Sequence, residues 1–440
     1  MKGNGLKAQL LRAAGGSMVI KFAFALISFL LSILLARTLG AEGFGAYSFA
    51  LAIIMLLATP AQVGIPELIV RETAKIQVKE NWSLLRGLWK WGNWAVVFFS
   101  GLALLIAVVL LVFIFHSDSP QRTQTILIGL ALIPLMALGN IRSACIRGLR
   151  HTVLGQLSDS IIRPGLLLLF ILCFAYVGSS VSLKAENVML LYVAAVIISY
   201  LVNTLILGRV KPIALSKTDS LYYESKIWIK AIIPLALVSG FQLVNSYADI
   251  IILGLYGTDA EVGIYKAVLQ LALLVSFGLQ AINQVLHPHF SRLYTLNEHQ
   301  KLQNLVTISA RAILLISLPL VLILVFFGAD LLKLFYGDLF YTGGVALAVL
   351  AIGQLINTSM GSVGALLNMT GHERYTVRGV AFAAVTNIVL NIVLIPPYGM
   401  LGAAIATAIS MAVWNLLLRY YVIQKLKIEP SGLFKPLKSN

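Results

Sequence analysis

About twelve apolar stretches, each roughly 20 residues long, follow one another along almost the whole chain. A helix rises about 1.5 Å per residue, so a stretch of this length crosses the ~30 Å hydrocarbon core of a bilayer. A core folded in water would not produce such stretches in series. Only 11% of the residues are charged and 59% are hydrophobic, whereas soluble domains are about 25% charged. We therefore expect an all-α integral membrane protein.

The expected membrane spans are roughly 17–38, 43–65, 91–115, 123–142, 154–177, 188–208, 228–254, 263–287, 308–328, 341–368, 377–396 and 399–424. The first span follows a short basic leader with Lys2, Lys7 and Arg12, which resembles the start of a signal peptide. The apolar stretch after this leader is about 22 residues long and contains no small-residue cleavage site. We therefore expect a retained first helix.

The distribution of Lys and Arg predicts the orientation in the membrane. Most of the 33 basic residues lie at the two termini and in every second loop, whereas the loops on the other side hold only Arg122, Lys184 and Lys333. Basic loops stay in the cytoplasm, so both termini are expected to be cytoplasmic, in a multi-pass protein of the inner membrane. The net charge of +16 then follows from topology and from contact with anionic lipid headgroups. Nucleic-acid binding is not required to explain it.

The chain divides into two expected halves of six spans each. The N-terminal lobe covers 1–210, a cytoplasmic linker covers 211–227, the C-terminal lobe covers 228–424, and a basic cytoplasmic tail covers 425–440. An internal repeat supports this division, because Gly45 and Tyr47 in the turn after span one align with Gly263 and Tyr265 after span seven. Halves of equal orientation are typical of transporters that bind substrate between them near the middle of the membrane.

Ionisable residues inside spans are costly and therefore mark candidate functional sites. Arg163 lies deepest, in span five, and Asp159 precedes it by one helical turn on the same face. The two residues either form a structural ion pair or line a wet cavity in which the cation orients an anionic group. Pro164 follows directly and could loosen the helix.

Five further charged residues lie nearer to span ends. Lys21 and Arg311 either line the cavity or extend to the cytoplasmic interface. Arg37 and Lys266 lie near the outer ends, where positive charge runs against the general distribution. Asp249, near the outer end of span seven, either pairs with Lys266 or carries a coupling ion such as a proton or sodium.

Polar residues recur at helical spacing in the second half of the chain. Gln270 and Gln284 lie on one stripe of span eight, and Gln354 and Asn357 lie on one stripe of span ten. Span eleven adds Asn387 and Asn391. Such stripes either line a water-filled passage or join helices to one another, and we favour cavity lining.

The sequence gives no sign of an enzyme, a cofactor or a metal centre. The six histidines are scattered, and no Walker A sequence for nucleotide hydrolysis is present. Cys145 and Cys173 lie in or beside apolar stretches, as small core residues do. We therefore expect a transporter without a cofactor.

Three short segments resemble a known family. Leu-Leu-Ala-Arg-Thr-Leu-Gly at 34–40, Glu-Gly-Phe-Gly-Ala-Tyr-Ser at 42–48 and Thr-Gly-His-Glu-Arg-Tyr at 370–375 are similar to turns in the polysaccharide-biosynthesis branch of the multidrug/oligosaccharidyl-lipid/polysaccharide exporter superfamily. Arg37 matches the first-span turn of that family. The resemblance implies a MATE-like fold of about twelve helices in two six-helix halves around a central cavity.

The resemblance also implies a function. The chain would flip an undecaprenyl-diphosphate-linked oligosaccharide, such as an O-antigen unit for lipopolysaccharide, across the membrane by alternating access, with a polysaccharide polymerase and glycosyltransferases as partners. Two alternatives within the superfamily are a peptidoglycan-precursor flippase and an ion-coupled small-molecule antiporter. The excess of basic over acidic residues inside the spans favours an anionic substrate. A structural scaffold would not need Arg163 so deep in the membrane, and a membrane transferase would carry a catalytic motif in a loop.

Overall fold

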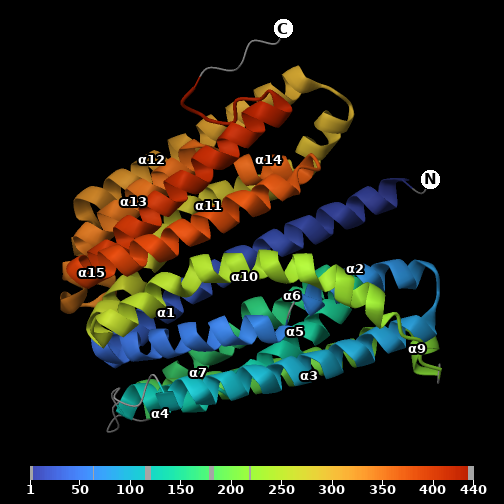
Figure 1. The fold of residues 1–440 in the computed structure, drawn as a ribbon, viewed down its shortest axis with the longest axis horizontal. Coiled ribbons are helices and arrows are strands. Elements are labelled where there is room, and N and C mark those ends of the chain that lie inside the picture. Colours follow the sequence, from blue (N-terminus) through green and yellow to red (C-terminus); the bar gives the residue numbers. More distant parts are fainter. Residues whose placement is uncertain (1–2, 63, 114–119, 178–182, 218–219, 435–440) are drawn as a thin grey trace. The chain divides into compact units, whose positions relative to one another are not determined.

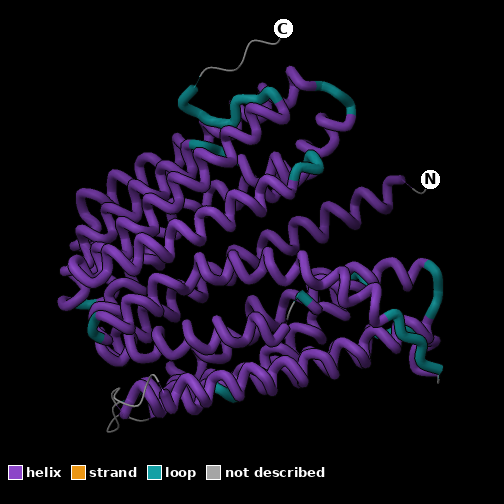
Figure 2. Tube along the Cα trace, in the orientation of Figure 1, coloured by secondary structure: helices purple, strands orange, loops and turns teal. Residues whose placement is uncertain are grey.

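The computed structural model describes residues 3–62, 64–113, 120–177, 183–217 and 220–434, and within these ranges every regular element is a helix (Figure 2). Residues 1–2, which include Lys2 of the predicted leader, and residues 435–440 of the predicted tail lie outside the described ranges. The first part of the chain contains α1 (Gly3–Gln62), α2 (Ile65–Val78), α3 (Trp82–Phe113), α4 (Pro120–Gly129), α5 (Leu132–Gly148), α6 (Thr152–Leu157), the π-helical turn η1 (Ser158–Ile162), α7 (Arg163–Val177), α8 (Ala185–Val210) and α9 (Ile213–Lys217). The second part contains α10 (Ser225–Tyr256), α11 (Asp259–Thr295), α12 (His299–Tyr336), the 3-10 turn η2 (Asp338–Gly343), α13 (Gly344–Ser359), α14 (Val363–Met369) and α15 (Glu373–Leu426).

Nine helical stretches of the described chain are long and apolar enough to cross a membrane. Two of them, within α1 and α15, are divided by glycines with non-helical backbone angles, Gly40 (φ 69°, ψ 180°) and Gly399 (φ 51°, ψ −132°). Only glycine adopts such angles without strain, so each long helix turns back at that point. With these divisions and the 32-residue α10, the helices are consistent with the twelve expected spans.

The chain forms two compact units. Unit 1 comprises residues 1–39 and 46–243, and unit 2 comprises residues 40–45 and 244–440. The division therefore lies inside α10, later than the linker at 211–227. The reason is that the start of α10 belongs to the core of unit 1, where Trp228 is 1% exposed and its ring lies 5.3 Å from that of Trp91.

The core of unit 1 is built around α5, which contacts α2, α3, α6 and α8. Ile141 and Ala144 of α5 are fully buried there, beside Ile69 of α2 and Leu88 of α3. The linker also packs onto this core, because Leu215 of α9 is 6% exposed. Leu215 of the predicted linker thus belongs to the core of unit 1.

In unit 2, the helices α11, α12, α13 and α15 run alongside one another (Figure 1). One end of this bundle has a core in which Phe290, Leu302, Leu366 and Leu418 are fully buried. These residues come from α11, α12, α14 and α15, so the core joins the ends of four helices.

The two turns of the internal repeat meet inside unit 2. A Cβ atom added at Gly45 would overlap the carbonyl oxygen of Asp259, and one added at Gly263 would overlap the carbonyl oxygen of Ala41. Each glycine therefore faces the residue four positions before the other. The two turns that the sequence identified as a repeat, at Gly45 and Gly263, therefore contact each other through their backbones. Each turn lies at the start of a helix, and the two helices cross there.

Candidate functional site

The fifth span contains a π-helical turn at the position of its charged residues. Thr152–Leu157 and Arg163–Val177 are α-helical, whereas Ser158–Ile162 form η1, in which the N–H of Arg163 donates to the carbonyl of Ser158 five residues earlier. The same carbonyl accepts a hydrogen bond from the hydroxyl of Ser199 in α8 at 3.2 Å. Single π-helical turns occur frequently at functional sites, because they change the direction in which side chains point.

Asp159 and Arg163 form an ion pair within this turn. The Nη2 atom of Arg163 lies 3.4 Å from the Oδ1 atom of Asp159 and 3.4 Å from its carbonyl oxygen. The Arg163 side chain is 15% exposed and the Asp159 side chain is 29% exposed, so the pair is partly buried and still accessible from outside. An arginine in this setting can exchange or share its carboxylate partner with an incoming anion.

Polar atoms beside η1 lack partners among the described residues. The side chain of Asn203 in α8 is 1% exposed, and neither its Nδ2 nor its Oδ1 atom has a hydrogen-bond partner. The hydroxyl of Ser158 is buried and lacks a partner in the same sense. Buried polar groups are normally satisfied, so this part of unit 1 has the character of a hydrated or ligand-binding site.

A second polar cluster lies in unit 2, around the carboxylate of Asp249. This side chain is 3% exposed and accepts hydrogen bonds from the Tyr265 hydroxyl at 2.8 Å, the Thr407 hydroxyl at 3.4 Å and the N–H of Ile250 at 2.9 Å. Lys266 is half-buried and acts on Asp249 electrostatically at longer range. The partners that hold the carboxylate are therefore hydroxyl and amide groups.

Two asparagines of α15 extend this cluster. The Nδ2 atom of Asn387 donates to the Thr407 hydroxyl at 3.3 Å, and that of Asn391 donates to the Oδ1 atom of Asn387 at 3.0 Å. The Oδ1 atom of Asn391 is buried without a hydrogen-bond partner in the described chain. The cluster thus presents a carboxylate, a hydroxyl and amide oxygens within one connected network.

A third polar group joins α13 to α15. The Nδ2 atom of Asn357 donates to the Oε1 atom of Gln354 at 3.3 Å, and the Nδ2 atom of Asn415 donates to the Oδ1 atom of Asn357 at 3.0 Å. Gln354 is 4% exposed, and Asn357 is partly buried. These hydrogen bonds join the stripe predicted on span ten to a second helix.

The other predicted site residues are dispersed. Lys21, Arg37, Gln284 and Arg311 have exposed side chains, and Gln270 is partly buried. Lys21 and Arg37 lie in α1, Gln270 and Gln284 lie in α11, and Arg311 lies in α12.

Sequence reasoning missed four residues of these clusters. Ser199, Thr407 and Asn415 contact the predicted residues from other helices, and Tyr265 was noticed only as part of the repeat. Serine and threonine are common inside membrane helices, where they also bond to their own backbone, as the Ser410 hydroxyl does to the Ala406 carbonyl. The sequence spacing of these residues therefore did not distinguish them from the serines and threonines that bond only to their own helix.

Residues 10–294 match the family described as polysaccharide biosynthesis protein. The chain belongs to this family. Residues 234–393 also match the MatE family.

Three curated proteins that are similar to the chain are named as flippases or as a capsular polysaccharide biosynthesis protein. The probable low-salt glycan biosynthesis flippase Agl15 of Haloferax volcanii is 25% identical over 184 residues, which are 42% of this chain and 39% of the relative. The probable flippase AglR of the same organism is 33% identical over 176 residues, 39% of this chain and 37% of the relative. The capsular polysaccharide biosynthesis protein CapF of Staphylococcus aureus is 24% identical over 266 residues, 60% of this chain and 66% of the relative. The match thus spans about two fifths of the length of each archaeal relative.

Solved structures confirm the fold. An inward-facing multidrug resistance MATE family transporter superimposes with a TM-score of 0.73 at 13% identity, over 93% of this chain and 98% of that chain. The lipid II flippase MurJ, in an inward closed conformation, gives 0.72 at 13% identity, over 92% and 86%. The expectation of an all-α, multi-pass, MATE-like membrane protein is therefore confirmed. Two of the curated relatives are named as flippases, and these two neighbours are named as a transporter and a flippase.

Proposed function

We propose that this protein flips a lipid-linked oligosaccharide, joined to its lipid through a phosphate or diphosphate, across the cytoplasmic membrane during assembly of a surface polysaccharide. The observation that carries the proposal is a sheltered arginine inside a membrane span of a chain that belongs to the polysaccharide biosynthesis family. A diphosphate cannot enter hydrocarbon unpaired, and a guanidinium matches phosphate oxygens in a bidentate geometry. The flippase names of the relatives support the same substrate class.

Arg163 is the proposed phosphate contact, and Asp159 is its partner in the absence of substrate. The carboxylate compensates the charge of the guanidinium while the site is empty, and an incoming phosphate takes its place. The π-helical turn presents the two side chains at the same face of span five. Asn203 and Ser158 supply polar groups for sugar hydroxyls or water nearby.

The test is complementation in a host that lacks the gene. The leaflet occupied by the lipid-linked glycan and the amount of surface polysaccharide are measured with the wild type, Arg163→Gln and Arg163→Lys. Arg209→Gln is the matched control, because Arg209 is exposed in the last turn of α8. We expect Arg163→Gln to leave the glycan on the cytoplasmic leaflet, Arg163→Lys to restore part of the surface polysaccharide, and Arg209→Gln to behave as wild type. Full activity of Arg163→Gln at equal protein level would refute the proposed site.

A coupling cation is proposed at Asp249. The carboxylate, the Thr407 hydroxyl and the amide oxygens of Asn387 and Asn391 form an oxygen-rich network, and the Oδ1 atom of Asn391 has no other described partner. Oxygen donors of this kind suit a hard cation such as sodium, whereas protonation of the carboxylate would serve a proton-coupled cycle.

Purified protein distinguishes these two possibilities. Its unfolding temperature is measured in sodium chloride and in choline chloride, for the wild type, Asp249→Asn and the exposed Asp330→Asn as control. Sodium-dependent stabilisation is expected in the wild type and in Asp330→Asn, and its loss is expected in Asp249→Asn. Stabilisation by sodium that survives in Asp249→Asn would refute the site. An equal unfolding temperature in both salts would favour proton coupling.

The location proposed for both termini is the cytoplasm, from the distribution of Lys and Arg. The proposed partners are the glycosyltransferases that build the lipid-linked unit and the polymerase that consumes it. A peptidoglycan precursor or a cationic drug remains the alternative cargo, and normal surface polysaccharide in the gene deletion would favour those.

A further inference from the structure

The tenth span is broken, and the C-terminal segment lies at the break. Helix α13 ends at Ser359 and α14 begins at Val363, with Gly361 between them at a φ of +69°. A break in a helix leaves carbonyl groups without their usual partners. Here the carbonyl of Ser359 accepts hydrogen bonds from the hydroxyl of Ser431 and from the N–H of Gly432, both at 3.1 Å.

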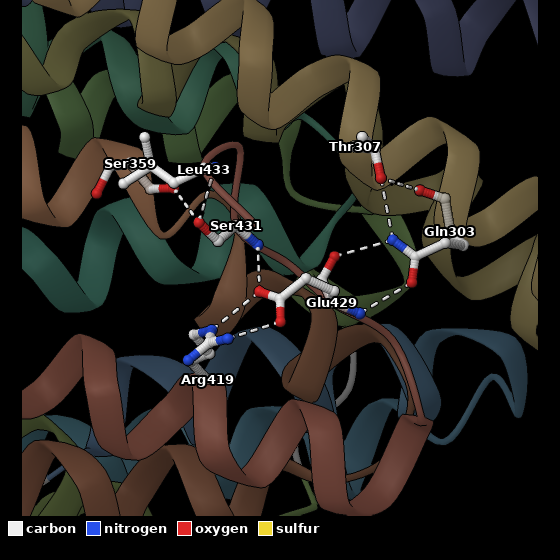
Figure 3. A network of polar contacts seen from close by, with 7 residues as sticks. All are labelled: Gln303, Thr307, Ser359, Arg419, Glu429, Ser431 and Leu433. Carbon is white, nitrogen blue, oxygen red and sulfur yellow. Dashed lines mark hydrogen bonds and ion pairs between the residues drawn. The ribbon is translucent and has the colours of Figure 1, made fainter. Parts of the chain in front are cut away.

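The C-terminal segment is held by its backbone as well. The Gln303 amide, at the start of α12, donates from Nε2 to the carbonyl of Glu429 at 2.9 Å and accepts from the N–H of Glu429 at 2.8 Å (Figure 3). The two bonds fix the segment in one register. A Cβ atom at Gly361 would lie 2.6 Å from the carbonyl oxygen of Pro430, so the break approaches the segment closely enough to require glycine.

A buried carboxylate fixes the other side of the segment. Glu429 is 3% exposed, and its two oxygens accept from the Nε and Nη2 atoms of Arg419 at 2.9 and 2.7 Å. The N–H of Ser431 donates to the same carboxylate at 3.1 Å, and the guanidinium of Arg419 lies 4.2 Å from the ring centre of Phe434. Because the carboxylate is buried whereas the Arg419 side chain is 24% exposed, removal of the guanidinium would leave a buried carboxylate without its ion-pair partner, which is strongly destabilising.

These contacts reach the polar residues of α13 and α15. Arg419 lies one turn after Asn415, whose side chain donates to Asn357. Ser359, which the segment caps, lies two residues after Asn357 in the same helix. The C-terminal segment is therefore anchored next to both members of the hydrogen bond that joins span ten to span twelve.

We propose that residues 427–434 form a latch that closes the break in span ten, and that Glu429 is a positioning residue for the side chains of Gln354 and Asn357. A tail that only contacted anionic lipid would need neither a buried carboxylate nor the two hydrogen bonds between its backbone and the Gln303 amide. The effect of the latch on transport rests on the function proposed above, whereas its effect on the break does not.

The first test measures amide hydrogen exchange in the purified full-length protein and in two truncations. One truncation ends at Leu426 and removes the latch, and the control ends at Phe434 and keeps it. We expect residues 360–369 to exchange about tenfold faster or more without the latch, which corresponds to ~1.4 kcal/mol of easier local opening. The control is expected to match the full-length protein. Unchanged exchange at 360–369 in the shorter truncation would overturn the latch.

Point variants keep the test decisive if the shorter truncation fails to fold. Glu429→Gln and Arg419→Gln are each expected to speed exchange at 360–369, and the charge swap Glu429→Arg with Arg419→Glu is expected to slow it again. Slow exchange in both single variants would overturn the role of the pair.

The positioning role is tested by surface polysaccharide at equal protein level in the membrane. Loss of polysaccharide with Glu429→Gln, and recovery with the charge swap, is the expected result. Faster exchange with unchanged polysaccharide would overturn the positioning role and leave the latch as a purely structural device. If the gene deletion itself has no effect on polysaccharide, the function proposed above fails, and the exchange experiment still decides the latch.

Discussion

The crossing of Gly45 and Gly263 allows the effect of one methyl group to be worked out. In Gly263→Ala the new Cβ would overlap the carbonyl oxygen of Ala41 and lie 3.0 Å from the amide nitrogen of Gly45. An ordinary carbon–oxygen contact is about 3.3–3.6 Å. Both neighbours are backbone atoms, so no side chain can rotate away, and the two helices must move apart.

Two opposing terms set the magnitude. Replacing a helical glycine by alanine in open space is favourable by about 0.5–1 kcal/mol. Forcing extra volume into a closely packed contact costs about 1–3 kcal/mol. Since the overlap at Gly263 is with backbone, the upper part of this range applies, and a net loss of about 2 kcal/mol is expected. Gly101 in α3 has no atom within 4 Å of an added Cβ, so Gly101→Ala should show only the favourable term.

The assay is reversible unfolding in mixed micelles with increasing denaturing detergent. The free energy of unfolding is expected to fall for Gly263→Ala and to stay equal or rise slightly for Gly101→Ala. Gly45→Ala should resemble Gly263→Ala, and the double variant should lose less than the sum, because the helices separate only once. If Gly263→Ala were as stable as Gly101→Ala, the helices could not cross at this distance.

Three further outcomes follow from buried contacts, each measured by the same unfolding titration. Trp228→Ala should lower the free energy of unfolding by about 3–5 kcal/mol, because it empties a fully buried site in unit 1. Thr407→Val should lower the free energy of unfolding by about 1–3 kcal/mol, because it leaves buried polar partners unsatisfied. Thr386→Val is the control and should cost little, because the Thr386 hydroxyl donates to the Phe382 carbonyl at an exposed position. Ser199→Ala should cost about 0.5–1.5 kcal/mol by removing one of the two hydrogen bonds to the carbonyl in the π-helical turn.

The spans were predictable because their signal is local. Whether an apolar stretch is long enough to cross a membrane depends only on its own residues. The predicted span 188–208, for example, falls inside α8 at Ala185–Val210. The turn at Gly40 was predictable for the same reason, since the next polar residues follow at once in the sequence. The position of Arg163 in a span needed nothing beyond its distance from the span ends.

Partners across the fold were not predictable, because they depend on which helix faces which. Asp249 was expected either to pair with Lys266 or to carry a coupling ion, and neither alternative predicted that the hydroxyls of Tyr265 and Thr407 would donate to its carboxylate. Glu429 lies in a segment whose composition predicted a basic tail, yet it is buried against Arg419. A single acidic residue among lysines carries no local sign that an arginine ten positions earlier will receive it.

The polar clusters of the two units differ in their chemistry, and this difference makes the two proposals separable. Unit 1 offers a cation at Arg163, paired with the carboxylate of Asp159, and a guanidinium suits an anionic headgroup. Unit 2 offers a carboxylate held by hydroxyls at Asp249, which suits a small cation. Arg163→Gln should therefore abolish glycan display while keeping stabilisation by sodium, because its charge plays no part in the Asp249 network. Asp249→Asn should abolish stabilisation by sodium, and under ion coupling it should slow display without preventing the anion from binding. Loss of both properties in both variants would mean that each substitution perturbs the whole fold, and the assignment of one chemistry to each unit would then fail.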